Sequence, residues 1–169
     1  MPRALASLPE DATVLVLDAE SADSTQAIAV KAGARLIVRP WTDFIEARRF
    51  ALSNVTTSWT LMLDADETLD DELRGDVGAV CDVETGPQPS TADCHPEQDS
   101  PVGESIVEGY RISRTTLFCG KPMRIWSGEK LLRLFRTDAA SLEANAVSGS
   151  DAAVHEHWIV GGAIAELPG

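Results

Sequence analysis

Residues 13–38 read TVLVLDAESADSTQAIAVKAGARLIV, in which two short apolar runs flank a segment rich in helix-forming residues. Residues 13–17 and 35–38 are predicted strands because Val, Leu and Ile dominate both runs. Residues 24–32 are a predicted helix, which Gly33 ends. The order strand, helix, strand at short spacing favours an α/β fold.

The same alternation continues along the chain. Residues 43–52 carry apolar side chains at helical spacing, and residues 59–63 (WTLML) form an unbroken apolar run. Such a run is typical of a strand buried on both faces of a parallel, helix-covered sheet. Further strands are predicted at residues 109–113, 130–136 and 152–159. The expected architecture is therefore a mostly parallel sheet flanked by helices.

The segment between these two sets of elements has a different composition. Residues 83–105 contain four prolines among Ser, Thr, Gly and acidic residues, which predicts a long loop. The whole chain has 169 residues, the length of one domain. We therefore expect a single domain, with halves 1–82 and 106–169 joined by an acidic, Pro-rich loop.

The net charge of −13 and the composition of the chain argue against several classes of function. General nucleic-acid binding needs clustered Lys and Arg over much of a surface, so no nucleic-acid partner is expected. No apolar run reaches the roughly 18 residues of a membrane span, and the start of the chain resembles no signal peptide. Three cysteines without paired spacing favour a reduced, cytoplasmic protein. Peripheral membrane contact stays open.

The basic residues are concentrated in one part of the chain. Seven of the 14 Lys and Arg residues lie within residues 111–136, where Glu129 is the single acid, giving a local net charge of +6. An acidic protein that keeps one cationic segment is suited to binding a small anion such as a phosphate-bearing ligand. A solvated basic face without a ligand explains the same count equally well.

Carboxylates follow two of the predicted strands. Asp18 ends the first strand, and Asp64-Ala65-Asp66 follows the third. In parallel α/β sheets ligands bind at the carboxyl ends of strands, and carboxylate pairs there suit Mg²⁺ or Mn²⁺. Capping of the helix predicted after Asp66 is the alternative for the Asp-x-Asp pair alone. With Asp18 at a second strand end, metal or nucleotide binding is favoured.

Two protein families have sequence motifs that resemble the segments around these carboxylates. Residues 61–69 resemble the aspartate-nucleophile motif of haloacid-dehalogenase-like phosphatases, in which Asp64 would be the nucleophile and Asp66 the general acid. No later strand ends in the paired aspartates that would complete that site.

The other resemblance covers most of the chain. It looks like a family 2 glycosyltransferase, of the branch typified by lipopolysaccharide core β-glycosyltransferases. The matching segments, in chain order, are DAESADST at 18–25, RPW at 39–41, RRFAL at 48–52, SWTLMLDADE at 58–67, GYR at 109–111, RLFR at 133–136 and VHE at 154–156. The resemblance implies a GT-A-like, Rossmann-like fold, a nucleotide-binding half before the loop and an acceptor and phosphate half after it.

The chain departs from this family pattern at several positions. The usual first strand with its Asn-Glu turn is absent, so we expect the domain to be truncated at its N-terminus. Glu20 and Ser24 replace two glycines of the family's turn, Arg49 replaces an asparagine, and residues 83–105 are an insertion.

The resemblance also implies roles for individual residues. Asp66, and His155 with it, would hold Mg²⁺ or Mn²⁺ against the diphosphate of a nucleotide-sugar. Asp18, Arg48, Asp64 and Arg133 would bind the nucleotide-sugar, with Asp18 at the base and Arg133 at the phosphates. Glu129 would be the base of an inverting transfer, and surface ion pairing is its alternative role.

The implied activity is metal-dependent transfer of a sugar from a nucleotide-diphospho-sugar to a glycan or lipid-linked acceptor. Two alternatives remain: a phosphatase that uses Asp64, and a catalytically degenerate nucleotide-sugar-binding remnant.

Overall fold

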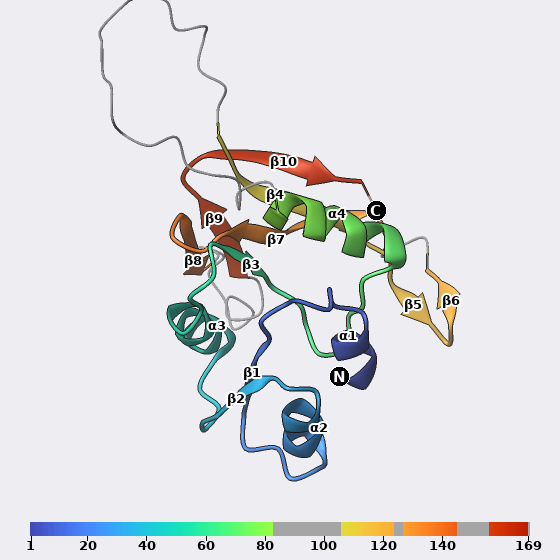
Figure 1. Cartoon of the computed structure of the whole chain (residues 1–169), viewed down its shortest axis with the longest axis vertical. Helices are drawn as coiled ribbons and strands as arrows, with labels where there is room; N and C mark the ends of the chain where they lie inside the picture. Colours follow the sequence, from blue (N-terminus) through green and yellow to red (C-terminus); the bar gives the residue numbers. More distant parts are fainter. Residues whose placement is uncertain (83–105, 124–126, 145–155, 169) are drawn as a thin grey trace, which may run out of the picture.

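The structure is a computed structural model, and it describes residues 1–82, 106–123, 127–144 and 156–168. Figure 1 shows the arrangement of the helices and strands. In chain order they are α1 (Pro2–Ala6), β1 (Leu15–Asp18), α2 (Thr25–Lys31), β2 (Arg35–Val38), α3 (Phe44–Ser53), β3 (Trp59–Leu61), α4 (Asp71–Asp82), β4 (Val107–Arg114), β5 (Leu117–Phe118), β6 (Lys121–Pro122), β7 (Glu129–Arg136), β8 (Ala140–Ala144), β9 (Glu156–Val160) and β10 (Ala163–Leu167).

Helices α3 and α4 begin at side chains that satisfy free backbone amides. The Asp43 carboxylate accepts a hydrogen bond from the Glu46 amide at 2.7 Å, and the Asp70 carboxylate accepts one from the Leu73 amide at 2.8 Å. Asp and Asn are favoured at this position because the first amides of a helix have no partner within it. These caps fix where α3 and α4 start relative to the strands before them.

The described strands form one parallel pair, one mixed four-stranded sheet and two antiparallel pairs. β1 pairs with β2 in parallel register, with Leu15 opposite Arg35. The four-stranded sheet has the order β10-β4-β7-β3, in which β10 is parallel to β4 and β7 is antiparallel to both β4 and β3. β5 pairs with β6, and β8 pairs with β9.

The expected mostly parallel sheet is therefore present only in part. β3 does not join β1 among the described residues; it pairs with β7, where Leu61 lies opposite Leu134. Trp59, Thr60 and Leu61 are also only partly buried, so the prediction of burial on both faces was wrong. The reason is an open cavity that lies beside β3.

The core lies where α4 covers the mixed sheet. Leu73 and Val77 of α4 pack against Ile112 of β4, Leu134 of β7 and Leu167 of β10. Their burial stabilises the sheet by roughly 1.5–3 kcal/mol for each large side chain. This packing anchors β7, which carries Arg133 one position before Leu134.

Candidate functional site

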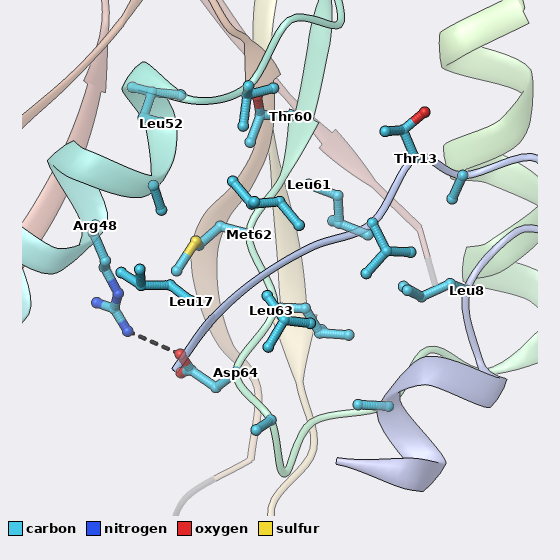
Figure 2. Close-up of a pocket in the computed structure, with 18 of the residues that line it drawn as sticks. Leu8, Thr13, Leu17, Arg48, Leu52, Thr60, Leu61, Met62, Leu63 and Asp64 are labelled. Carbon is cyan, nitrogen blue, oxygen red and sulfur yellow. Dashed lines mark hydrogen bonds and ion pairs between the residues drawn. The ribbon is translucent and has the colours of Figure 1, made fainter. Parts of the chain in front are cut away.

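A cavity of about 640 Å³ lies between β1 and β3. Leu17 of β1 and Leu61 to Leu63 line its apolar part, and Arg48 and Asp64 meet at one end of it (Figure 2). Asp18 lines the same cavity. The structure therefore brings three of the predicted nucleotide-sugar ligands, Asp18, Arg48 and Asp64, to one place.

Asp64 is the centre of a charged cluster at this end of the cavity. One of its carboxylate oxygens accepts a hydrogen bond from Arg48 of α3 at 2.9 Å, and the other accepts one from Arg133 of β7 at 3.1 Å. Arg133 also donates to Glu67 at 2.8 Å, and Glu67 accepts from the Asp64 amide at 3.0 Å. Two arginines from distant elements thus hold two carboxylates of one turn.

This geometry limits the chemistry open to Asp64. A carboxylate nucleophile needs an oxygen that is free to attack, whereas both oxygens of Asp64 are bound by guanidinium groups. The arrangement suits a residue that positions cations near a ligand.

The electrostatics of the cluster favour the charged form of Asp64. Burial alone would raise its pKa, but the neighbouring charges and hydrogen bonds of Arg133 and Arg48 outweigh burial and hold the pKa below its ordinary value. The site therefore keeps a fixed anion between two cations.

The low pKa of Asp64 predicts how stability depends on acid. Because its folded-state pKa lies below its unfolded value of about 3.9, its contribution is complete above that value and is lost as pH falls through the folded pKa. In urea unfolding, we expect the difference between the wild type and Asp64→Asn to be constant above about pH 5 and to shrink below about pH 4. A difference that grows toward low pH would contradict the assignment.

Asp66 is exposed and has no hydrogen bond or ion pair within the described residues. It lies in the short turn after Asp64, which the Glu67 amide closes by donating to the Asp64 carbonyl at 3.0 Å. A single carboxylate just after a strand suits a divalent cation such as Mg²⁺, which takes further ligands from the phosphates of its substrate. In the described ranges no group of three or more His, Cys, Asp or Glu side chains could hold a metal alone.

Asp18 is buried, with 4% of its surface exposed. Its carboxylate accepts hydrogen bonds from the Ser21 amide and the Gln26 side chain, both at 2.9 Å. Hydrogen bonding from Ser21, together with that from Gln26, holds its pKa below the ordinary value despite burial. Asp18 thereby ties the end of β1 to the turn and to α2.

This turn contains a strained residue. Glu20 has φ of +59°, in the left-handed region where glycine is favoured. The family pattern has a glycine at this position, so the backbone has kept a conformation that the present side chain fits poorly.

Replacing Glu20 with glycine is expected to stabilise the chain. An L-residue in this conformation costs roughly 1–2 kcal/mol, which exceeds the extra unfolded-state entropy of glycine. We expect the free energy of unfolding to rise by about 0.5–1 kcal/mol in urea denaturation. Glu10→Gly is the control, because Glu10 is exposed without a positive φ and its replacement should give a loss. A loss in both variants would contradict this interpretation.

The structure places the other predicted site residues apart from the cluster or outside its description. Glu129 is the exposed first residue of β7 and pairs with Arg114 at 2.6 Å. It lies four residues from Arg133, about 13 Å along the strand. His155 is outside the described residues.

Sequence reasoning missed one member of the cluster. Glu67 was not predicted as a site residue, although its position directly after Asp-Ala-Asp was a usable signal. Arg48 and Arg49 are neighbours in α3, and Arg48 is the one that binds Asp64. Arg49 instead donates two hydrogen bonds to the Leu142 carbonyl, at 2.6 and 3.1 Å, and so ties α3 to β8.

Comparison with known proteins connects this cluster to a family. Residues 2–77, which include β1 to β3, the Asp64 turn and Arg48, match the family model "Glycosyl transferase family 2". An uncharacterized glycosyltransferase of Mycobacterium tuberculosis is 28% identical over 148 residues, which cover 83% of this chain and 67% of that protein. These similarities support the interpretation of the chain as a family 2 glycosyltransferase.

Other relatives match a shorter part of the chain. An uncharacterized glycosyltransferase of Rickettsia conorii is 42% identical over 64 residues, 38% of this chain and 23% of that protein. A TPR repeat-containing protein of Synechococcus elongatus is 46% identical over 71 residues, 41% of this chain and 18% of that protein. The match to the Rickettsia protein spans about a quarter of its length.

The family match covers Arg48, Asp64 and Glu67 of the cluster, whereas Arg133 lies outside the matched residues. The matched segment ends in α4, beyond the Asp64 turn. The longest helix in the described ranges, α4, has 12 residues, too few to cross a membrane.

Proposed function

We propose that this chain transfers a sugar from a nucleotide-diphospho-sugar to a glycan or lipid-linked acceptor, with inversion at the anomeric carbon. The observation that supports this most strongly is the turn after β3, where Asp64 is fixed between two arginines and Asp66 is exposed, with no partner among the residues that the structure describes. The finer assignment, to acceptors of the lipopolysaccharide core type, rests on the family resemblance.

The donor would lie along the polar end of the cavity. Asp18 would meet the nucleobase, and the diphosphate would lie near Arg48, which lines the cavity, and near Arg133, which binds the same Asp64 carboxylate. Mg²⁺ or Mn²⁺, held by Asp66 and the diphosphate, would neutralise the charge that develops on the leaving group. His155 would be a further ligand of that ion.

The residues of the chain would contribute mainly charge and orientation. Arg48 and Arg133 fix Asp64 and keep two cations close to where the leaving diphosphate gains charge, which is the general form of electrostatic catalysis. Inversion needs one base to accept the proton of the acceptor hydroxyl. Glu129, held by Arg114 at the far end of β7, is the proposed base.

A donor-hydrolysis and transfer assay tests this function. The chain is incubated with a panel of nucleotide-diphospho-sugars and Mn²⁺, and release of nucleoside diphosphate is measured with and without EDTA. We expect metal-dependent release from one donor class, and NMR of the product should show the inverted anomer. Turnover of an aryl phosphate instead would select the phosphatase, and no release from any donor would favour a degenerate binding remnant.

A further inference from the structure

Two large aromatic side chains lie exposed beside the charged cluster. Trp41, in the loop between β2 and α3, is 53% exposed, and Phe44, the first residue of α3, is 44% exposed. Both line the same cavity as Arg48 and Asp64. Large aromatic side chains are mostly turned away from water, and in ligand sites they form the apolar lining around a few polar groups. This pair is therefore a candidate contact surface for a ligand of the cavity.

The aromatic pair is connected to the cluster by a short series of contacts. The ring centroids of Trp41 and Phe44 are 4.8 Å apart, with the rings edge to face at 79°. The guanidinium carbon of Arg48 lies 5.9 Å from the Phe44 ring centroid, and the same guanidinium donates to Asp64 at 2.9 Å. Figure 2 shows Arg48 reaching from α3 toward Asp64. A ligand that contacts the aromatic pair thus lies close to the place proposed for the diphosphate.

The loop that carries Trp41 is held at both ends. At its start, the Arg39 amide donates to the Asp18 carbonyl at 3.0 Å, and the Arg39 guanidinium pairs with Glu46 of α3 at 2.6 Å. At its end, the Asp43 carboxylate caps α3. Binding to a surface that is already ordered costs less conformational entropy than binding to one that must first be ordered. These contacts therefore make Trp41 suitable as a fixed part of a binding site.

The neighbours of the pair favour a nucleobase as its ligand. Asp18 ends β1, its register partner Val38 ends the parallel strand β2, and Trp41 follows three residues later. A nucleobase has two flat faces and an edge of hydrogen-bonding groups, and proteins hold unpaired bases by stacking them on aromatic side chains and bonding their edges. The aromatic pair supplies the flat surface, and Asp18 supplies an acceptor on the adjoining strand.

We propose that Trp41, supported by Phe44, is the surface on which the nucleobase of the donor stacks. This inference rests on the proposed function, because the base belongs to the nucleotide-diphospho-sugar. Every base has a flat face that can stack, so Trp41 contributes affinity for a nucleotide over a diphosphate without a base. Trp41 is thus a binding residue that acts apart from the reacting atoms.

Replacing Trp41 with leucine tests this role by calorimetric titration in the presence of Mn²⁺. The probes are UDP, dTDP, CDP, GDP and ADP, of which the tightest wild-type ligand is carried forward, and inorganic pyrophosphate, which has no base. We expect Trp41→Leu to bind that nucleotide about 10-fold more weakly, which is within the usual effect of losing a base–aromatic stack. Its affinity for pyrophosphate should stay within about twofold of the wild type, and Trp41→Phe should keep most of the nucleotide affinity.

Phe118→Leu is the matched control. Phe118 of β5 is 63% exposed and lies outside the set of residues that line the cavity, so its replacement should leave nucleotide affinity unchanged. An unchanged nucleotide affinity in Trp41→Leu, or an equal loss in Phe118→Leu, would overturn the proposal. So would an equal loss of pyrophosphate affinity in Trp41→Leu, because the ring would then support the site in general.

Two further results separate this role from its alternatives. If Trp41→Leu weakens binding of the intact nucleotide-sugar but not of the free nucleotide, the rings hold the sugar and the proposal is wrong. If Asp66→Asn abolishes nucleotide binding with Mn²⁺ while Trp41→Leu keeps it in full, the stacking role alone fails and the proposed function stands. A wild type that binds none of the nucleotides would overturn both.

Discussion

Replacing Arg133 with methionine is expected to lower the free energy of unfolding by about 2–3 kcal/mol, below the 3–5 of a fully buried pair because water reaches part of the site. The Arg133 side chain is 12% exposed and binds both Asp64 and Glu67. Its removal leaves two partly buried carboxylates with Arg48 as their remaining cation in the cluster. Urea unfolding at pH 7 measures the loss.

The same variant should lose donor affinity. If Arg133 keeps a cation beside the diphosphate, affinity for UDP with Mn²⁺ should fall by about 10–100-fold, the value of a hydrogen bond to a charged group. Calorimetric titration of the folded variant measures this change. An unchanged affinity would remove Arg133 from the donor site, even if the stability loss is found.

A surface ion pair provides the matched control. Arg74 pairs with Asp71 at 2.6 Å within α4, and their side chains are 41% and 94% exposed. Arg74→Met should change stability by no more than about 0.5 kcal/mol, because exposed pairs contribute little. Equal losses in both variants would show that the Asp64 cluster has no special stabilising role.

Replacing Asp66 with asparagine is expected to reduce sugar transfer by about 10²–10³-fold, the usual effect of removing one group that stabilises the charge of a transition state. Stability should change by no more than about 0.5 kcal/mol, because the side chain is exposed and has no partner in the described ranges. The variant thus separates function from folding. Initial rates of nucleoside diphosphate release measure the effect.

Glu72→Gln is the control for Asp66→Asn. Glu72 is an exposed acid six residues further along, at the start of α4, and its replacement removes one negative charge in the same way. The rate of nucleoside diphosphate release by Glu72→Gln should stay within about twofold of the wild-type rate, because salt at physiological concentration screens the effect of an exposed charge on the site. A large loss in the control would mean that local charge, and not a specific ligand, governs the rate.

The sequence predicted the elements whose signals are local. The strands at 15–18 and 35–38 and the helices at 25–31 and 44–53 agree with the structure within a few residues, because apolar runs, capping residues and Gly33 act over short distances. The strand at 129–136 was predicted for the same reason.

The pairing of the strands could not be predicted in the same way. β3 pairs with β7, more than 70 residues further along the chain, and β10 pairs with β4 in parallel. Periodicity in one strand carries no information about which distant strand lies beside it. The prediction of a mostly parallel sheet therefore went beyond what the pattern could support.

In the candidate site, too, positions marked by local sequence signals were predicted, and contacts that depend on distant strands were not. Asp18 and Asp64 were predicted from their positions at strand ends, and the resemblance added Arg48 and Arg133. The contact between Arg133 and Glu67 required the β3–β7 pairing and was missed. The role of Asp18 in holding its own turn was also visible only once Ser21 and Gln26 were placed beside it.

Metal-dependent nucleotide binding at Asp66 is the central claim, and a thermal-shift measurement tests it most directly. The wild type and Asp66→Asn are heated with UDP and Mn²⁺, with either component alone, and with both plus EDTA. At a UDP concentration 100 times its Kd, the wild type should gain about 2.7 kcal/mol, or roughly 5–10 °C in Tm, only when both components are present. Asp66→Asn should show no such gain. An equal shift in the variant, or a wild-type shift that persists in EDTA, would contradict the account.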